Sequence, residues 1–250
     1  MPRRGEVLLA MGVLLVLWHI LAALVQGPIL PAPFTVGIAL VRGFQGELGW
    51  HFLASAGRVI ISILLSIATA APLGLLLGLS PGLHRLVSPF LYLLYPIPKV
   101  VLVPILILFF RVGDLAKILL IYLILFFQFF QILVLVRDAA AGLRPELLLS
   151  VRSLGAGRRA LFWFVYLPAS LPAILTAVRR SIGTAVAVLY LSELLATRYG
   201  LGYYIYIQAS TFFDYPAMYG GIVLMSGMGL ALYLIVDALE RRWCRWQFVS

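Results

Sequence analysis

The sequence predicts an all-α membrane protein with about six transmembrane helices. Of its 250 residues, 63% are hydrophobic and only 11% are charged, and the mean hydropathy is +1.07. Charged residues make up about a quarter of an average soluble domain. The apolar runs are about 20 residues or longer, which is the length that a helix needs to cross a bilayer, and they lack the alternation of barrel strands. We therefore expect one transmembrane domain over residues 1–250.

Six apolar runs define the expected spans. They are residues 7–25, 52–79, 86–110, 115–136, 171–196 and 216–239. Arg3 and Arg4 precede the first run, as they would in a signal peptide, but the run continues to Val25 and no A-x-A site closes it. We interpret it as an uncleaved first span, ahead of a core over residues 52–239.

The basic residues give the expected orientation, because Lys and Arg concentrate in cytoplasmic connections. With the N-terminus inside, the opposite side and the spans hold six of the 19 basic residues, Arg42, Arg58, Lys99, Arg111, Lys117 and Arg198. The cytoplasmic segments hold the other thirteen, Arg3, Arg4, Arg85, Arg137, Arg144, Arg152, Arg158, Arg159, Arg179, Arg180, Arg241, Arg242 and Arg245. Both termini and the loop over residues 138–170 are therefore expected in the cytosol. The single cysteine, Cys244, is expected to be a cytosolic thiol that a reagent reaches only from that side.

Three connections fall on the expected outer side, and one of them, residues 111–117, is only a turn. Residues 27–51 are a proline-containing linker followed by a short amphipathic piece, and residues 199–215 are rich in Tyr and Phe. For the aromatic segment two interpretations fit: a belt at the level of the lipid headgroups, or a docking or gating surface.

The long cytoplasmic connection contains an Arg-rich, amphipathic stretch over residues 145–172. Pro145 and Glu146 suit a first helical turn, and Gly155 with its neighbours can end the helix or turn the chain sharply. The apolar positions recur at helical spacing, at Leu147, Leu148, Val151 and Leu154. Such a helix fits either the groove of a partner protein or the surface of the lipid headgroups.

The same stretch resembles the coupling loop of ATP-binding-cassette importer permeases, whose pattern is E-A-A-x-x-x-G, nine residues, then I-x-L-P. Here Gly155 is followed by nine residues and then by Val-Tyr-Leu-Pro at 165–168. The chain is similar to the permease subunits of the nitrate, taurine and aliphatic-sulfonate importers. Four long stretches carry the resemblance in the same order, residues 73–91, 95–121, 145–179 and 199–224.

The resemblance implies a type I importer (MetI-like) permease fold with a cytoplasmic coupling helix, in the bacterial inner membrane. It implies a homodimer with two ATPase subunits and a periplasmic or lipid-anchored solute-binding protein, carrying a small solute by alternating access. The residues expected to couple to the ATPase are Glu146, Ser150, Val151, Arg152, Leu154, Gly155, Ala156 and Pro168. In one respect the chain departs from the family, because Leu149, Ser150 and Val151 stand where the pattern has Glu-Ala-Ala. Glu146, one turn earlier, could replace the missing charge.

Ionisable residues at membrane depth are costly and face a partner or a cavity. Lys99 and Glu193 lie within expected spans. They could form a structural ion pair, which we favour, or Lys99 could attract an anionic solute in the translocation path. Thr184 and Ser192 could line the same path, although small hydroxyl residues also pack between membrane helices.

Residues for catalysis are missing from the sequence. The three histidines are scattered without metal-ligand spacing, and no phosphate-binding G-x-x-x-x-G-K-[ST] occurs. We expect no cofactor on this chain, with ATP and Mg²⁺ on the partner ATPase. The basic residues lie between spans, which argues against nucleic acid as a partner. Two other functions are kept open: an ATP-independent channel or carrier, and a polytopic membrane enzyme acting on lipid.

Overall fold

The computed structural model describes residues 4–94, 114–143 and 145–247, and each regular element within them is a helix. The long helices are α1 (Arg4–Val25), α3 (Leu48–Leu79), α6 (Asp114–Ala141), α9 (Leu167–Ala196) and α11 (Tyr215–Trp243). The shorter ones are α2 (Pro33–Gln45), α4 (Pro81–Leu94), α7 (Pro145–Ser153), α8 (Arg158–Leu161), α10 (Leu201–Ile207) and the single turns η2 (Phe162–Tyr166), η3 (Gln208–Phe212) and η4 (Arg245–Gln247). The chain is an all-α membrane protein, as the sequence predicts.

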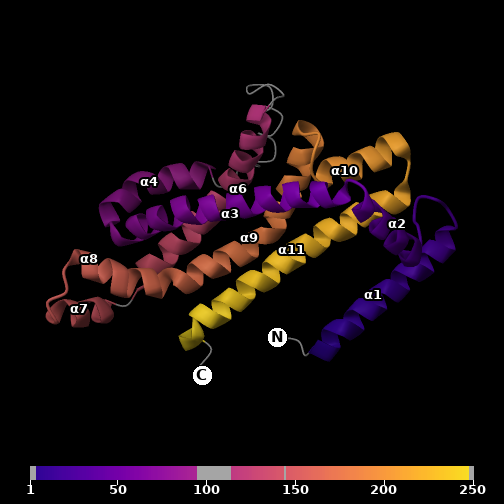
Figure 1. The fold of residues 1–250 in the computed structure, drawn as a ribbon. Helices are drawn as coiled ribbons and strands as arrows, with labels where there is room; N and C mark the ends of the chain where they lie inside the picture. The colour runs from indigo at the N-terminus through magenta and orange to yellow at the C-terminus, as the bar shows by residue number, and fades with distance from the viewer. Residues whose placement is uncertain (1–3, 95–113, 144, 248–250) are drawn as a thin grey trace.

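The long helices run side by side, so the bundle has two distinct ends (Figure 1). One end carries α7, α8 and the C-terminal end of α11, and the other carries α2, α10 and the start of α11. We call these the α7 end and the α10 end. The loop with α7 and α8 and the C-terminal end of α11, all expected in the cytosol, therefore lie at one end, and α2 and α10, from two of the segments expected outside, lie at the other (Figure 1).

Four helical segments within the described residues are long and apolar enough to cross a membrane. They are residues 5–25, 48–79, 159–195 and 215–243. They match four of the six predicted spans. Of the two remaining predicted spans, 86–110 falls partly outside the described residues, while α6 covers 115–136.

The structure corrects the start of the fifth span. We expected the span to begin at Leu171, with Pro168 marking the entry, but helical structure continues without a break from Arg158 to Ala196. The run contains a π-helical turn, in which the Leu167 N–H bonds to the Phe162 carbonyl. Proline has no N–H to donate, and the wider turn directly precedes Pro168. The second span also starts earlier than predicted, at Leu48.

The packing of α3 against α6 is the most extensive helix contact in the described residues. Gly74 and Gly78, one turn apart on α3, face α6 at close range. A Cβ on Gly74 would come within 2.9 Å of the Leu133 carbonyl oxygen, and one on Gly78 within 2.6 Å of the Arg137 carbonyl oxygen. Paired small residues at this spacing let membrane helices approach until their backbones touch.

Burial differs sharply between the first helix and the C-terminal end of the chain. Only 6% of the apolar window of α1 is buried, so this helix presents its side chains to surrounding lipid or to another chain. Cys244, in contrast, has no exposed surface and packs in the hydrophobic core. The prediction that a reagent reaches this thiol in the folded protein is therefore wrong. Burial, together with the nearby charge of Glu240, also raises the pKa of Cys244, which keeps the thiol protonated.

Replacing Gly78 with alanine is expected to destabilise the bundle, because the added methyl group meets α6 backbone rather than a flexible side chain. We expect a loss of about 1–3 kcal/mol in the free energy of unfolding, typical of an overpacked core. Gly57→Ala on the same helix is the matched control, since nothing lies within 4 Å of its Cβ position. Unfolding of both variants by denaturant in detergent would measure the difference, and equal stabilities would contradict the close packing.

Candidate functional site

Helix α7 is a short helix that ends in a defined turn. The Ala156 N–H bonds to the Val151 carbonyl at 3.4 Å, and the Gly155 N–H bonds to the Arg152 carbonyl at 2.9 Å. Gly155 has φ of +82°, the left-handed conformation that favours glycine. Together these features form a Schellman motif, which satisfies the last carbonyls of a helix. The predicted turn at Gly155 is therefore confirmed, although its cause is backbone conformation, since nothing lies within 4 Å of the Cβ position.

Most of the predicted coupling residues lie on the surface of α7 and the turn that follows. Glu146, Ser150, Arg152, Leu154 and Gly155 are exposed, and Val151 and Ala156 are partly buried. Leu154 is 86% exposed and Leu149 is 63% exposed. Pro168 lies in the first turn of α9, away from this surface. Contact of these residues with an ATPase stays a prediction, and the exposed leucines suit either a partner protein or the lipid surface.

A polar stripe runs along α3, inside the bundle. Its members recur at helical spacing and are all buried, His51, Ser55, Arg58, Ser62 and Ser66. The Ser62 hydroxyl donates to the Arg58 carbonyl at 2.7 Å and the Ser66 hydroxyl donates to the Ser62 carbonyl at 2.7 Å. The other three side chains reach across to α9 and to the segment that follows it.

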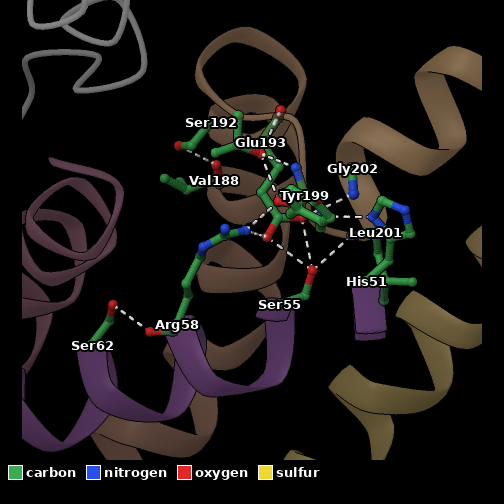
Figure 2. Close-up of polar contacts among 12 residues, drawn as sticks. His51, Ser55, Arg58, Ser62, Val188, Ser192, Glu193, Tyr199, Leu201 and Gly202 are labelled. Atoms are coloured by element: carbon green, nitrogen blue, oxygen red, sulfur yellow. Dashed lines mark hydrogen bonds and ion pairs between the residues drawn. The ribbon is translucent and has the colours of Figure 1, made fainter. Parts of the chain in front are cut away.

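The carboxylate of Glu193 on α9 is the centre of this arrangement (Figure 2). It has no exposed surface. Arg58 Nη1 forms an ion pair with Oε1, the Ser55 hydroxyl lies 2.8 Å from Oε2, and the Gly202 N–H donates to Oε2 at 2.9 Å. We call the side chains of His51, Ser55, Arg58 and Glu193, with the backbone of residues 199–202, the Glu193 cluster. A buried carboxylate is tolerable only with such compensation, because an unpaired buried charge costs several kcal/mol.

The Glu193 cluster also caps helix α10. The first N–H groups of a helix lack acceptors within the helix, and here side chains from other helices act as the acceptors. The Gly200 N–H donates to His51 Nδ1 at 2.9 Å, the Leu201 N–H donates to the Ser55 hydroxyl at 2.8 Å, and the Gly202 N–H binds Glu193. A carboxylate at the N-terminus of a helix also suits the helix dipole. The Tyr199 carbonyl accepts from Arg58 Nη1 at 2.7 Å.

Two glycines allow the backbone of residues 200–202 to lie close to α9. Gly200 has φ of +136°, and a Cβ there would overlap the carboxyl group of Glu193. A Cβ on Gly202 would lie 2.6 Å from the Tyr190 carbonyl oxygen. The backbone of residues 200–202 can therefore contact α9 directly only because both positions lack a side chain.

The structure brings together only some of the residues predicted to line a translocation path. Ser192 and Glu193 have no exposed surface and lie inside the subunit, so neither faces a path in this conformation. Thr184 is partly exposed and stays a candidate. Lys99 lies outside the described residues. The charge partner that Glu193 has in the structure is Arg58, a pairing that the sequence alone did not suggest.

The aromatic segment over residues 199–215 divides into two parts. Tyr199, Tyr203 and Tyr204 gather around the His51 ring, with centroid distances of 5.8, 6.2 and 5.4 Å. Further along, Tyr206, Phe212 and Phe213 are 45%, 66% and 64% exposed. Tyr203 and Tyr204 pack inside the subunit, while Tyr199, which is 57% exposed, and the second part remain available as a belt or a docking surface.

A second buried charge cluster joins α9 to α11 toward the α7 end. Arg179 Nη1 lies 2.7 Å from Asp237 Oδ1 and 3.0 Å from Glu240 Oε2. The Thr176 hydroxyl donates to Glu240 Oε1 at 2.8 Å, and Arg241 Nε donates to Asp237 Oδ2 at 2.9 Å. Helix α9 is thus tied by charge to α3 near its C-terminal end and to α11 near its middle. In the described part of the chain, no group of His, Cys, Asp and Glu side chains could hold a metal ion.

The sequence does contain a signal for the Glu193 cluster. Polar residues at 51, 55, 58, 62 and 66 follow a spacing of three or four in an otherwise apolar run, which places them on one helix face. Arg58 entered the prediction only as one of the basic residues used to orient the chain, so the polar stripe was not predicted. The partner of Arg58 could not be identified from the sequence, because Glu193 is 135 positions away.

Arg58→Met is expected to destabilise the subunit, because it leaves Glu193 buried without a counter-charge. The expected loss is about 3–5 kcal/mol in the free energy of unfolding. Adding Glu193→Gln should restore part of the loss, since the neutral amide no longer needs a cation. Arg180→Met, at an exposed position on α9, is the control and should have little effect. Unfolding in detergent is measured for the two single variants Arg58→Met and Glu193→Gln, for the double variant and for the control, and strictly additive losses in the double variant would contradict the pair.

The comparisons with known proteins agree with one another. A family model described as binding-protein-dependent transport system inner membrane component matches residues 70–245. The taurine transport system permease protein TauC of Escherichia coli K12 is 32% identical, over 98% of this chain and 92% of that protein. The putative aliphatic sulfonates transport permease protein SsuC of Bacillus subtilis 168 is 29% identical, over 96% and 87%.

A solved structure supports the fold independently of these relatives. The MetNI methionine ABC transporter, in an inward-facing conformation, superposes with a TM-score of 0.63 at 21% identity. The superposition covers 76% of this chain and 93% of that chain. The chain therefore has the type I importer permease fold and belongs to the family of binding-protein-dependent transport system inner membrane components, as the permease subunit of an ATP-binding-cassette importer.

Proposed function

We propose that two copies of this chain form the translocation pathway of an importer for a small sulfonate, such as taurine. The observation that carries the coupling part of the proposal is the exposed helix α7, closed by the left-handed turn at Gly155. It presents Leu149 and Leu154 to a partner subunit. The taurine and sulfonate relatives support the solute class.

A continuous helical run from Arg158 to Ala196 follows α7 and can act as its lever, a rigid element that moves with α7. At 1.5 Å per residue the run is about 58 Å long, well beyond the roughly 30 Å of bilayer hydrocarbon. When ATP draws the two ATPase subunits together, α7 moves with them and the lever carries the displacement to the α10 end. There the Glu193 cluster joins the lever to α3 and to the segment over residues 199–202. The cavity then opens to the binding protein, and release of ADP reverses the movement.

ATP and Mg²⁺ belong to the partner ATPase in this proposal, and this chain supplies no covalent chemistry. Transport of taurine or a short alkanesulfonate into vesicles containing the permease, its ATPase and its binding protein tests the solute class. We expect uptake that depends on ATP and on the binding protein. Uptake without the ATPase would instead favour a channel or carrier, and uptake of nitrate but not of sulfonates would exclude the proposed solute.

Gly155→Ala is expected to uncouple hydrolysis from transport without preventing insertion. An L-residue in the left-handed conformation is disfavoured by about 1–2 kcal/mol, so the turn that positions Leu154 should rearrange. Gly157→Ala is the matched control, because its Cβ position is open and its φ is not in the left-handed region. Copurification of the ATPase subunit and its stimulated ATP hydrolysis are the measurements. Equal coupling in the two variants would exclude a role for the Gly155 turn.

Orientation can be tested with single cysteines placed at the two ends. In a Cys244→Ser background, Ser153→Cys lies on exposed α7 and Ser210→Cys lies on exposed η3. A membrane-impermeant thiol reagent should label the η3 cysteine in intact spheroplasts and the α7 cysteine only in inverted vesicles. The reverse pattern would place α7 outside the cell and exclude contact with a cytosolic ATPase.

A further inference from the structure

A polar cleft lies at the α10 end, between α2, α10 and the start of α11. Its volume is about 370 Å³. The polar side chains that line it are Thr35, Arg42, Tyr204, Gln208 and Asp214. None of them belongs to α7 or to the four side chains of the Glu193 cluster, so neither coupling nor that cluster accounts for the cleft.

The cleft holds one positive and one negative side chain, Arg42 and Asp214, and the two form no ion pair with each other. Within the described residues, Arg42 forms no hydrogen bond or ion pair, and it is exposed. Asp214 uses Oδ1 to accept the Ala217 N–H at 3.0 Å, which caps α11, and its other oxygen has no protein partner in the described part of the chain. Burial, with the Asp214 charge as a smaller cause, raises the pKa of Tyr204. The phenol therefore stays protonated and available as a donor.

An apolar surface adjoins the cleft. Ile38 lines the cleft and also belongs to an exposed stripe on α2 with Phe34 and Val41, whose exposed fractions are 38%, 79% and 62%. Helix α1, almost entirely unburied, is joined to α2 by residues 26–32. An amphipathic helix with this composition lies in the membrane interface, with its apolar face in the acyl region. The cleft thus borders lipid on the side of Ile38.

We propose that this cleft binds a zwitterion that carries an acidic group and a primary ammonium group, supplied by the phosphoethanolamine headgroup of a membrane phospholipid. The phosphate lies against Arg42, the ammonium against Asp214, and the acyl chains follow the apolar stripe of α2. A free amino-sulfonate offers the same two charges and is the other source of this chemistry. The apolar stripe favours the lipid, because a free solute gains nothing from it.

The test uses the purified full-length permease in detergent and a short-chain phosphatidylethanolamine as the probe. Binding is followed by intrinsic fluorescence and by the melting temperature. Arg42→Gln removes the positive charge, and Asp214→Asn removes the negative charge while keeping a residue that caps helices well. Each change should weaken binding about tenfold, in line with the loss of one charge-assisted contact. Arg198→Gln is the matched control, since Arg198 is exposed near the same end but does not line the cleft.

Phosphatidylglycerol of the same chain length and free taurine complete the experiment. Selective stabilisation by phosphatidylethanolamine, lost in both cleft variants and kept in the control, supports the proposal. Equal effects of phosphatidylglycerol, with no loss in Asp214→Asn, would overturn the zwitterion site in favour of simple anion attraction. Binding of taurine with no response to either lipid would overturn the lipid source. Binding of the phosphatidylethanolamine that is unchanged in Arg42→Gln would overturn the site itself.

Discussion

A single buried carboxylate determines how the α10 end of this permease is built. Glu193 has no exposed surface, so its charge must be compensated within the protein. Arg58, Ser55 and the Gly202 N–H supply that compensation from three different segments. The requirement is mutual, because the first N–H groups of α10 also lack partners until the cluster forms. Electrostatics thus joins α3, α9 and α10 into one unit where apolar contacts alone would permit sliding.

The same helix, α9, is also fixed by charge near its middle. Arg179 lies between Asp237 and Glu240 of α11, and both acids are almost completely buried. These ion pairs therefore attach α9 to α11 at its middle and to α3 at its C-terminal end, so the three helices are held in a fixed register.

The sequence was informative wherever local physics decides the outcome. Apolar runs located the long helices, and the glycine at 155 located a turn that its left-handed φ explains. It was less informative where the outcome depends on distant residues. Arg58 and Glu193 are far apart in the chain, so their pairing depends on the tertiary fold. The burial of Cys244 likewise depends on how the core packs around the C-terminal end of α11. The start of the fifth span was predicted too late for another reason. A π-helical turn lies directly before Pro168, so the helix does not need to begin at that proline.

The departure from the family pattern at residues 149–151 has a structural counterpart. The resemblance places a glutamate where this chain has Leu149, and Leu149 is 63% exposed on α7. Glu146 is exposed three residues earlier, and residues three apart are neighbours on a helix surface. The surface that α7 presents therefore carries an apolar side chain, Leu149, where the pattern has an acid, and its own acid, Glu146, lies about one helical turn nearer the start of the helix.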